Sequence, residues 1–173
     1  MARIVAAGLA DKVSPAFGDR GPAAIAALIR RDLARASVRY LVAERDGVVV
    51  GTARIALRQE ASTGGLAPVA RAIGWPRATR GALVLGLLAH PRLADDEAYV
   101  EELAVSAAHR RHGIGRALLR ECHVIARDAA KRRVTLWVSA NNGPAVAMYR
   151  DDGYRITRRR RALRTWLLFG APV

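Results

Sequence analysis

Apolar and polar residues in the first third of the chain recur with two different periods. After Pro22, "PAAIAALIRRDLARA" places apolar residues at helical spacing, and these are Ile25, Leu28, Ile29 and Leu33. "VRYLVAERDGVVVGTARIAL" then gives two β-rich runs around Asp46-Gly47, a dipeptide that accepts the positive φ angles of a tight turn. The pattern predicts a helix with one buried stripe, followed by an antiparallel hairpin at about 39–57.

A second group of elements follows residue 96. "EAYVEELAV" predicts a strand at 97–105, and "RVTLWV" predicts another at 133–138. Between them a helix is predicted from Gly113 onward, because its apolar residues step by three or four positions and share one face. The residues on that face are Ile114, Leu118, Cys122, Ile125 and Ala129.

The last predicted helix begins near Pro144, which suits a first helical turn, and ends before Gly153. Short β-rich runs at the two ends of the chain, "RIVAA" and "YRITRRRRALRTWLLF", predict one edge strand and two final strands. The interval 59–96 has no clear period and predicts a loop with one or two short helices. This order predicts a single α/β (α+β) domain over residues 1–173, with a mixed sheet.

The net charge of +14 raises the question of a nucleic-acid partner. All basic residues except Lys12 and Lys131 are arginine, a bias typical of a GC-rich genome. The densest basic run, "TRRRRALRT", contains no aromatic residue that could stack on a base. The composition therefore favours a solvated strand pair, or a field for an anionic ligand, over a nucleic-acid interface.

Membrane, disulfide and metal chemistry receive little support from the sequence. The longest apolar run, "GALVLGLLA", is shorter than the ~18 residues that span a bilayer, and the N-terminus does not form a secretory signal, so a cytoplasmic protein is expected. Cys122 has no second cysteine to pair with and is expected to be a buried apolar residue. No metal is expected, because the histidines fall on separate predicted elements without ligand spacing. These are His90, His109, His112 and His123.

The stretch "RRHGIGRALL" at 110–119 carries the clearest chemical signal. A strand, a glycine-rich turn and a helix point free backbone N–H groups and the positive end of a helix dipole at one place, which suits phosphate. The stretch is not a dinucleotide fingerprint, because Leu118 stands at the third glycine position, and it lacks the Lys-Ser or Lys-Thr of a P-loop. A plain helix start after a tight turn is the alternative.

"YVEELAVSAAHRRHGIGRALL" and "VTLWVSANNGPAVAMYRDDGY" together resemble the GNAT superfamily of acetyl-CoA-dependent N-acetyltransferases. The likeness covers residues 98–154 in detail. It rests on the Arg-x-x-Gly-x-Gly turn after a strand, on Asn142, and on Tyr149 seven positions later. It implies a GNAT-like sheet of six to seven mostly antiparallel strands with flanking helices.

The resemblance also implies how acetyl-CoA is held. Strands 98–105 and 133–138 would splay apart at a bulge near Leu103-Ala104, and the exposed strand edge would pair with the pantetheine arm. The residues implied at that edge are Leu103, Ala104 and Val105. The residues implied around the diphosphate are Arg110, Arg111, His112, Gly113, Ile114 and Gly115, and Asn142 is a further implied cofactor contact.

Direct attack of an amine on a thioester requires an oxyanion donor, a base and an acid for the departing thiolate. A backbone N–H freed by the bulge would be the donor. The family pattern assigns the base to Glu101, with Glu102 as the alternative, since neighbours in a regular strand face opposite sides. A structural ion pair is the competing role for either glutamate. Tyr149 is the implied acid, with simple packing as the alternative, and Asn142 or Asn141 would cap its helix.

Five of the fifteen acidic residues lie within eight positions, and they are Asp95, Asp96, Glu97, Glu101 and Glu102. They predict either a negative field for a cationic amine or, at 95–97, a solvated turn. The expected acceptor is a primary amine of a small cationic molecule, a peptide or a protein. The alternatives are a noncatalytic acyl-CoA sensor and an arginine-rich nucleic-acid binder. The interval 59–96, with Trp75, would form a lid over the acceptor or a homodimer contact.

Overall fold

The computed structural model describes residues 4–5, 17–33, 37–58, 67–87 and 93–159 of the 173-residue chain. The chain forms two compact units, residues 1–136 and residues 137–173. None of the helices in the described ranges is long and apolar enough to cross a membrane.

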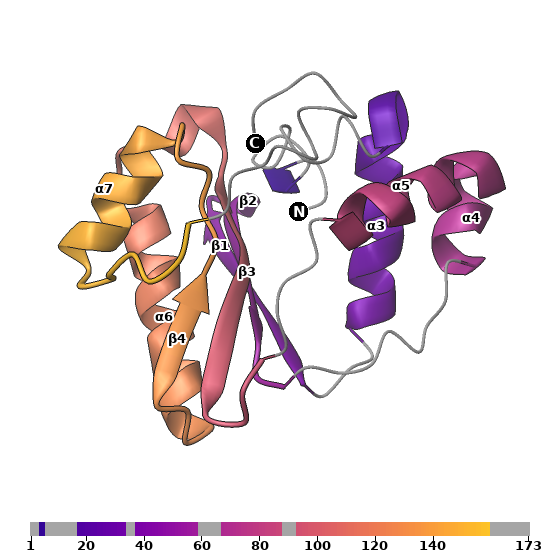
Figure 1. Ribbon diagram of the computed structural model, residues 1–173. Helices are drawn as coiled ribbons and strands as arrows, with labels where there is room; N and C mark the ends of the chain where they lie inside the picture. The colour runs from indigo at the N-terminus through magenta and orange to yellow at the C-terminus, as the bar shows by residue number, and fades with distance from the viewer. Residues whose placement is uncertain (1–3, 6–16, 34–36, 59–66, 88–92, 160–173) are drawn as a thin grey trace. The chain divides into compact units, whose positions relative to one another are not determined.

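The first unit contains a four-stranded sheet in the order β1-β2-β3-β4 (Figure 1). Its strands are β1 (Val38–Arg45), β2 (Val48–Ala56), β3 (Glu97–Val105) and β4 (Arg133–Leu136). The first three strands pair antiparallel, and β4 joins β3 in parallel. The predicted mixed, mostly antiparallel sheet is therefore confirmed for these strands. A parallel partner requires a crossover connection, and the helix between β3 and β4 supplies it.

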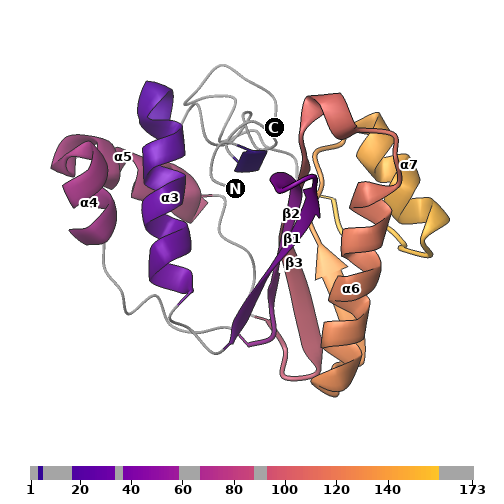
Figure 2. The ribbon, with the colours of Figure 1, turned by 180° about the vertical axis from the view of Figure 1, so that it is seen from behind.

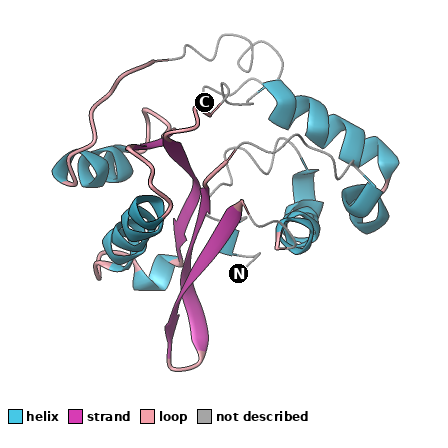
Figure 3. Ribbon diagram, turned by 90° about the horizontal axis from the view of Figure 1, so that it is seen from below, coloured by secondary structure: helices cyan, strands magenta, loops and turns pink. Residues whose placement is uncertain are grey.

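β1 and β2 form the predicted hairpin around Asp46 and Gly47. Both turn residues adopt positive φ angles, 52° at Asp46 and 74° at Gly47. A two-residue turn of this kind matches the right-handed twist of the flanking strands, which is visible in Figure 3. The hairpin thus sets the register of β2, the strand that carries most of the sheet's buried residues.

Helix α6 (Ile114–Asp128) packs against β1, β2 and β3 and covers one face of the sheet (Figure 2). Its fully buried residues are Leu118, Leu119, Cys122 and Ala126. The predicted stripe is correct at Leu118 and Cys122. Gly51 in β2 permits the close contact, because a Cβ there would lie 3.0 Å from Ile114 Cγ2 and 3.2 Å from Leu118 Cδ1. Gly51 therefore fixes how closely the first turn of α6 approaches the sheet.

The first unit also contains the α-helices α3 (Gly21–Asp32), α4 (Ala67–Ile73) and α5 (Trp75–Leu87). The helix predicted after Pro22 is confirmed, with that proline in its first turn. Its predicted stripe is buried at Ile25 and Ile29, whereas Leu33 follows the end of the helix and is 62% exposed. The described part of the interval 59–96 contains the helices α4 and α5, in agreement with the sequence. α4 packs against both α3 and α5. Trp75, at the start of α5, is 61% exposed.

The described parts of the strands predicted at the two ends of the chain, residues 4–5 and 154–159, are not strands. Ile4 and Val5, the described residues of the expected edge strand, are helical. Residues 154–159 form no strand, and residues 160–173 lie outside the described part, so the described sheet has four strands where six to seven were expected. A short apolar run does not separate strand from helix, which is the reason that the prediction fails at Ile4 and Val5.

The second unit contains α7 (Gly143–Asp151). Oδ1 of Asn142 accepts a hydrogen bond of 3.3 Å from the N–H of Ala145, so Asn142 is the residue that caps this helix. The chain leaves the helix through Gly153, whose φ of 90° is favourable only for glycine. The predicted bounds of this helix are confirmed.

Candidate active site

The turn that joins β3 to α6 presents a row of backbone donors. Gly113 precedes the helix with a φ of 77°, and Arg111 also has a positive φ of 68°. Among the described residues, the N–H groups of 111–115 donate to no backbone acceptor, as expected at the start of a helix. A Cβ on Gly113 would meet nothing within 4 Å. These donors and the positive end of α6 together form a place that favours an anion.

The loop before α6 is held by its own polar groups. Nε of Arg110 donates to the carbonyl of Val105 at 3.3 Å, and Nδ1 of His112 lies 2.8 Å from the carbonyl oxygen of Arg110. Nδ1 of His109 lies 2.8 Å from Oγ of Ser106. The structure thus places the predicted residues 110–113 in an exposed turn between β3 and α6, and residues 114 and 115 in the first turn of α6.

β3 and β4 separate within the sheet. They pair in parallel over Glu97–Val100 of β3, and the last pair is Val100 with Leu136. β3 continues to Val105, so its residues 101–105 have an edge that β4 does not cover. An uncovered strand edge offers alternating N–H and C=O groups to an extended partner. Leu103, Ala104 and Val105 lie beyond the last residue pair that β4 makes with β3.

The bulge in β3 falls at Glu101, and the prediction of Leu103-Ala104 is wrong. Arg54 of β2 pairs with Glu102, whereas the next residue, Ile55, pairs with Val100, so Glu101 is the extra residue. The bulge therefore coincides with the point at which β4 leaves β3. A bulge leaves an extra residue unpaired in the ladder and bends its strand, which frees backbone groups there.

The bulge also corrects the expectation that Glu101 and Glu102 face opposite sides. Glu102 is the cross-strand partner of Arg54, and Oε2 of Glu101 forms an ion pair with Nη1 of the same arginine. Both carboxylates thus lie on the Arg54 side of the sheet. Strand alternation fails here because the inserted residue shifts the register by one position.

The two glutamates differ in their surroundings. The side chain of Glu101 is 32% exposed and engaged with Arg54. Oε2 of Glu102 is buried and has no hydrogen-bond partner among the described residues. Burial raises the pKa of Glu102 above its ordinary value, with opposing effects from the Arg54 charge, which lowers it, and the Asp32 charge, which raises it. A raised pKa makes Glu102 a stronger proton acceptor than an ordinary glutamate.

Sequence reasoning missed three residues of this cluster. Nη2 of Arg54 donates to Oδ2 of Asp32, the last residue of α3, at 2.9 Å. The Arg54 guanidinium also lies 5.7 Å from the centre of the Tyr40 ring, and burial raises the pKa of Tyr40 to about 12. The available signal was a lone arginine inside the β-rich run "VVVGTARIAL", since a charge is rarely buried without a partner.

The acidic residues at 95–97 are separate from this cluster. Nη2 of Arg133 donates to Oδ1 of Asp96 at 2.9 Å, and this hydrogen bond lowers the pKa of Asp96. Lys131 Nζ donates to the carbonyl of Asp95, and Oε2 of Glu97 accepts from the N–H of Ala94. Of the two predicted roles, the structure supports a polar turn for these three residues.

Two further predicted residues, Tyr149 and Cys122, lie on the helices α7 and α6. In the second unit, Tyr149 is half-buried on α7, and its ring meets the edge of Tyr154 with centroids 5.7 Å apart. Cys122 is buried as predicted, and burial raises the pKa of its thiol to about 12, which removes it as a nucleophile. Within the described ranges, no three His, Cys, Asp or Glu side chains could hold a metal ion.

The sequence of the chain matches the model of a known protein family. Residues 8–154 match the family model described as the acetyltransferase (GNAT) family. The chain therefore belongs to that family, whose cosubstrate is acetyl-CoA, and the match runs through both compact units. No match is found among the curated proteins.

Solved structures of similar fold include aminoglycoside acetyltransferases. One is AAC(6')-Iy in complex with the bisubstrate analog CoA-S-monomethyl-acetylneamine, with a TM-score of 0.57 at 17% identity over 88% of this chain and 84% of that one. Another is apo AAC(6')-IG from Acinetobacter haemolyticus, with a TM-score of 0.55 at 18% identity over 89% of each chain. A transcriptional regulator from Bacillus halodurans C-125 gives a TM-score of 0.62 at 14% identity, over 92% and 87%. At these identities the likeness shows the fold.

Proposed function

We propose that this chain transfers the acetyl group of acetyl-CoA to a primary amine by direct attack. The observation that carries the proposal is the buried carboxyl of Glu102, which lies beside the bulge where β4 leaves β3. A carboxyl of raised pKa at the opening of an uncovered strand edge has the two properties that this reaction needs. It can take up a proton, and it lies next to a place for an extended thioester.

The described residues fit acetyl-CoA at two places. The N–H groups of 111–115 suit its diphosphate, and the exposed side chains of Arg110 and Arg111 add positive charge beside them. The edge of β3 at Leu103–Val105 suits the pantetheine arm, whose amides can extend the sheet. Bound there, the cosubstrate supplies an activated acetyl thioester.

Glu102 receives the proton of the attacking amine. An ammonium group has no lone pair, so the amine must lose a proton before or during attack. Glu101 is the weaker candidate for this role, because its carboxylate is already paired with Arg54. The sequence pattern favoured Glu101, and the burial of Glu102 is the reason for preferring its neighbour.

The bulge at Glu101 supplies a hydrogen-bond donor for the developing oxyanion. A residue left out of the β2–β3 ladder and uncovered by β4 keeps its N–H for another acceptor. Tyr149 donates a proton to the departing sulfur. The Tyr149 assignment rests on the sequence pattern, as does a cofactor contact for Asn142, whose side-chain oxygen caps α7.

The charge of the cluster supports a cationic acceptor. Asp32, Glu101 and Glu102 are three carboxylates that share the single positive charge of Arg54. When all are ionised, two negative charges remain in excess, and these would attract an amine in its protonated form. Small polyamines, aminoglycosides and peptide N-termini all carry such an amine. The solved aminoglycoside acetyltransferases of the same fold are consistent with this class.

A thiol-release assay tests the proposal. The full chain is mixed with acetyl-CoA and, separately, with an alkylamine, a polyamine, an aminoglycoside and a peptide with a free N-terminus. Amine-dependent release of free thiol, with acetylated amine detected by mass spectrometry, is the expected result. Glu102→Gln should lower kcat on the order of a hundredfold or more, and Glu97→Gln, on the same strand, should leave it near the wild-type value.

Two other outcomes would contradict the proposal. Calorimetric binding of acetyl-CoA without thiol release on any amine would indicate a noncatalytic acyl-CoA sensor. Absence of acetyl-CoA binding, together with tight and salt-sensitive binding of RNA or DNA, would indicate a nucleic-acid-binding protein on this fold.

A further inference from the structure

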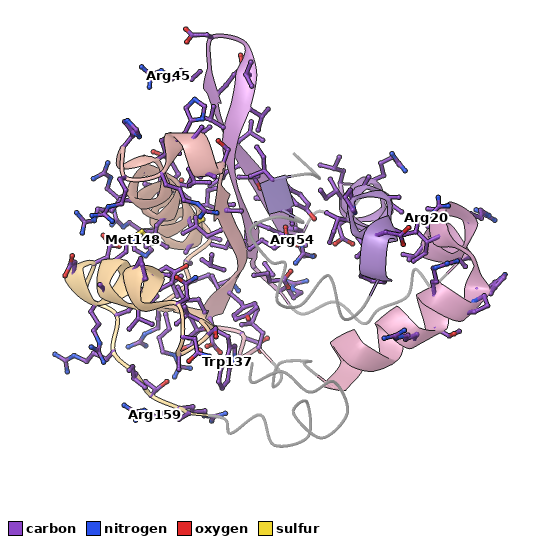
Figure 4. All side chains as sticks on the ribbon, turned by 90° about the horizontal axis from the view of Figure 1, so that it is seen from above. Arg20, Arg45, Arg54, Trp137, Met148 and Arg159 are labelled. Carbon is purple, nitrogen blue, oxygen red and sulfur yellow. The ribbon has the colours of Figure 1, made fainter. Side chains whose placement is uncertain are left out.

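The guanidinium of Arg54 is held from three sides. Asp32 at the end of α3 accepts its Nη2 hydrogen bond, Glu101 of β3 pairs with Nη1, and the Tyr40 ring of β1 lies beneath it. Figure 4 shows the Arg54 side chain extending from β2 on the side of α3. Arg54 is only 8% exposed. A side chain fixed by partners on three separate elements has little freedom to change rotamer.

These contacts distinguish the two glutamates of the bulge. Both terminal nitrogens of Arg54 are engaged, one with Asp32 and the other with Glu101. Glu102 is opposite Arg54 in the ladder, yet its buried Oε2 has no hydrogen-bond partner among the described residues. Arg54 therefore pairs with Glu101, whereas Oε2 of the neighbouring Glu102 has no hydrogen-bond partner among the described residues.

We propose that Arg54, anchored by Asp32, is a positioning residue for acetyl transfer, because it holds Glu101 in an ion pair and leaves Glu102 as the carboxyl that receives the amine proton. The inference rests on the proposed function, since it presumes that Glu102 acts as the base. It adds two residues, from α3 and β2, to a site that is otherwise built on β3 and the turn before α6.

The charged and titratable groups that face Glu102 come from four elements. They are Asp32 of α3, Tyr40 of β1, Arg54 of β2 and Glu101 of β3. Beyond the effect of burial, the Arg54 charge lowers the pKa of Glu102 and the Asp32 charge raises it. Removing one or the other charge should therefore move the titration of Glu102 in opposite directions. A purely structural ion pair would affect stability without this opposite displacement.

The test is the pH dependence of kcat/KM with an amine that the wild-type chain acetylates. The acidic limb reports the group that must lose its proton. Arg54→Gln should move this limb to higher pH, and Asp32→Asn should move it to lower pH, each by about half a unit or more. Arg54→Lys should return the acidic limb toward its wild-type position, because it keeps the positive charge. Its kcat should stay reduced, because lysine cannot contact Asp32 and Glu101 through two separate nitrogens.

Arg45→Gln is the matched control, since Arg45 lies on the same hairpin at the end away from Arg54 (Figure 4). Its side chain is 61% exposed, and the same loss of charge should leave the limb in place. Thermal melts identify variants that do not fold. If Arg54→Gln is one of them, Glu101→Gln replaces it, because this variant frees the guanidinium for Glu102 and should move the limb to lower pH.

The outcomes separate the inference from the proposed function. If the wild-type chain acetylates no amine, the proposed function fails and this inference fails with it. If the wild-type chain is active and the limbs of the folded Asp32, Arg54 and Glu101 variants coincide with that of Arg45→Gln, the inference is overturned and the function stands. Opposite displacements for Asp32→Asn and Arg54→Gln would support it.

Discussion

Arg54 and Asp32 form a buried ion pair that joins β2 to the end of α3. Nη2 of Arg54 lies 2.9 Å from Oδ2 of Asp32, and the two side chains are 9% and 5% exposed. The pair spans 22 positions of sequence. Its burial means that loss of either partner leaves a charge in a poorly solvated place, which costs far more than loss of a surface pair.

Asp32→Ala should therefore destabilise the fold. Arg54 would lose its most buried carboxylate contact and keep the partly exposed Glu101, and we expect the free energy of unfolding to fall by about 3 kcal/mol. Urea denaturation measures this change. Arg45→Ala breaks the exposed contact between Arg45 and Asp46 and should have little effect. Equal effects of the two substitutions would mean that the Asp32–Arg54 pair contributes nothing beyond a surface contact.

Glu102→Gln should make the fold more stable while it removes activity. The raised pKa of Glu102 means that the folded chain holds this proton more tightly than the unfolded chain does. Stability from the neutral form is complete below the unfolded pKa and is lost as pH rises through the folded pKa. Glutamine is never charged, so the variant should melt at a higher temperature than the wild type above the folded pKa.

This difference in melting temperature should close as the pH falls into the ordinary glutamate range. Glu97→Gln, at the start of the same strand, serves as the comparison and should give a difference that changes little with pH. A Glu102→Gln variant that is less stable than the wild type at every pH would contradict this prediction. It would show that the folded chain stabilises the ionised Glu102 carboxylate, although its Oε2 has no hydrogen-bond partner among the described residues.

Gly113→Ala should weaken acetyl-CoA binding more than it weakens the fold. The φ of 77° places Gly113 in the left-handed region, where a side chain costs about 1–2 kcal/mol. Gly47 provides a matched control, because it has a φ of 74° and a Cβ added there would likewise meet nothing within 4 Å. Both variants should lose similar stability.

Only the Gly113 variant should lose affinity for acetyl-CoA in a calorimetric titration. The loss should be about tenfold if the full strain energy at residue 113 is subtracted from the binding free energy. An unchanged dissociation constant for Gly113→Ala, or an equal loss of affinity for Gly47→Ala, would show that the turn at Gly113 does not bind acetyl-CoA.

Tyr149→Phe should lower kcat and leave the fold intact. The ring contact with Tyr154 survives the substitution, and a thermal melt separates an effect on kcat from an effect on folding. Loss of a general acid reduces kcat on the order of a hundredfold or less here, because a thiolate is already an acceptable leaving group. Steady-state kinetics with one slowly acetylated and one rapidly acetylated amine would measure the change in kcat. Wild-type kcat with both would leave Tyr149 as a packing residue.

Elements defined by local pattern could be predicted from the sequence. Asp46-Gly47 specifies a turn by its own backbone preference, and the stripe around Leu118 and Cys122 specifies the buried face of α6. Ile4 and Val5 show the limit of this approach, since a short apolar run fits a helix as well as a strand.

The part of the site that lies in the turn before α6 could be predicted from the sequence. The part that depends on contacts between residues far apart in the sequence could not. The position of the bulge at Glu101 follows from the pairing of Arg54 with Glu102, which is a property of two strands together. The contact of Asp32 with Arg54 likewise requires the fold. For this reason the strand alternation rule assigned Glu101 and Glu102 to opposite sides of the sheet. Nothing in the sequence indicated that both lie beside Arg54.

A crystal structure of the chain with CoA tests the proposed site most directly. We expect the diphosphate oxygens to lie within hydrogen-bond distance of the N–H groups of 111–115, with the pantetheine arm along residues 103–105 of β3 and its sulfur directed toward Glu102. A diphosphate bound elsewhere, or a pantetheine arm that leaves the β3 edge uncovered, would contradict this site.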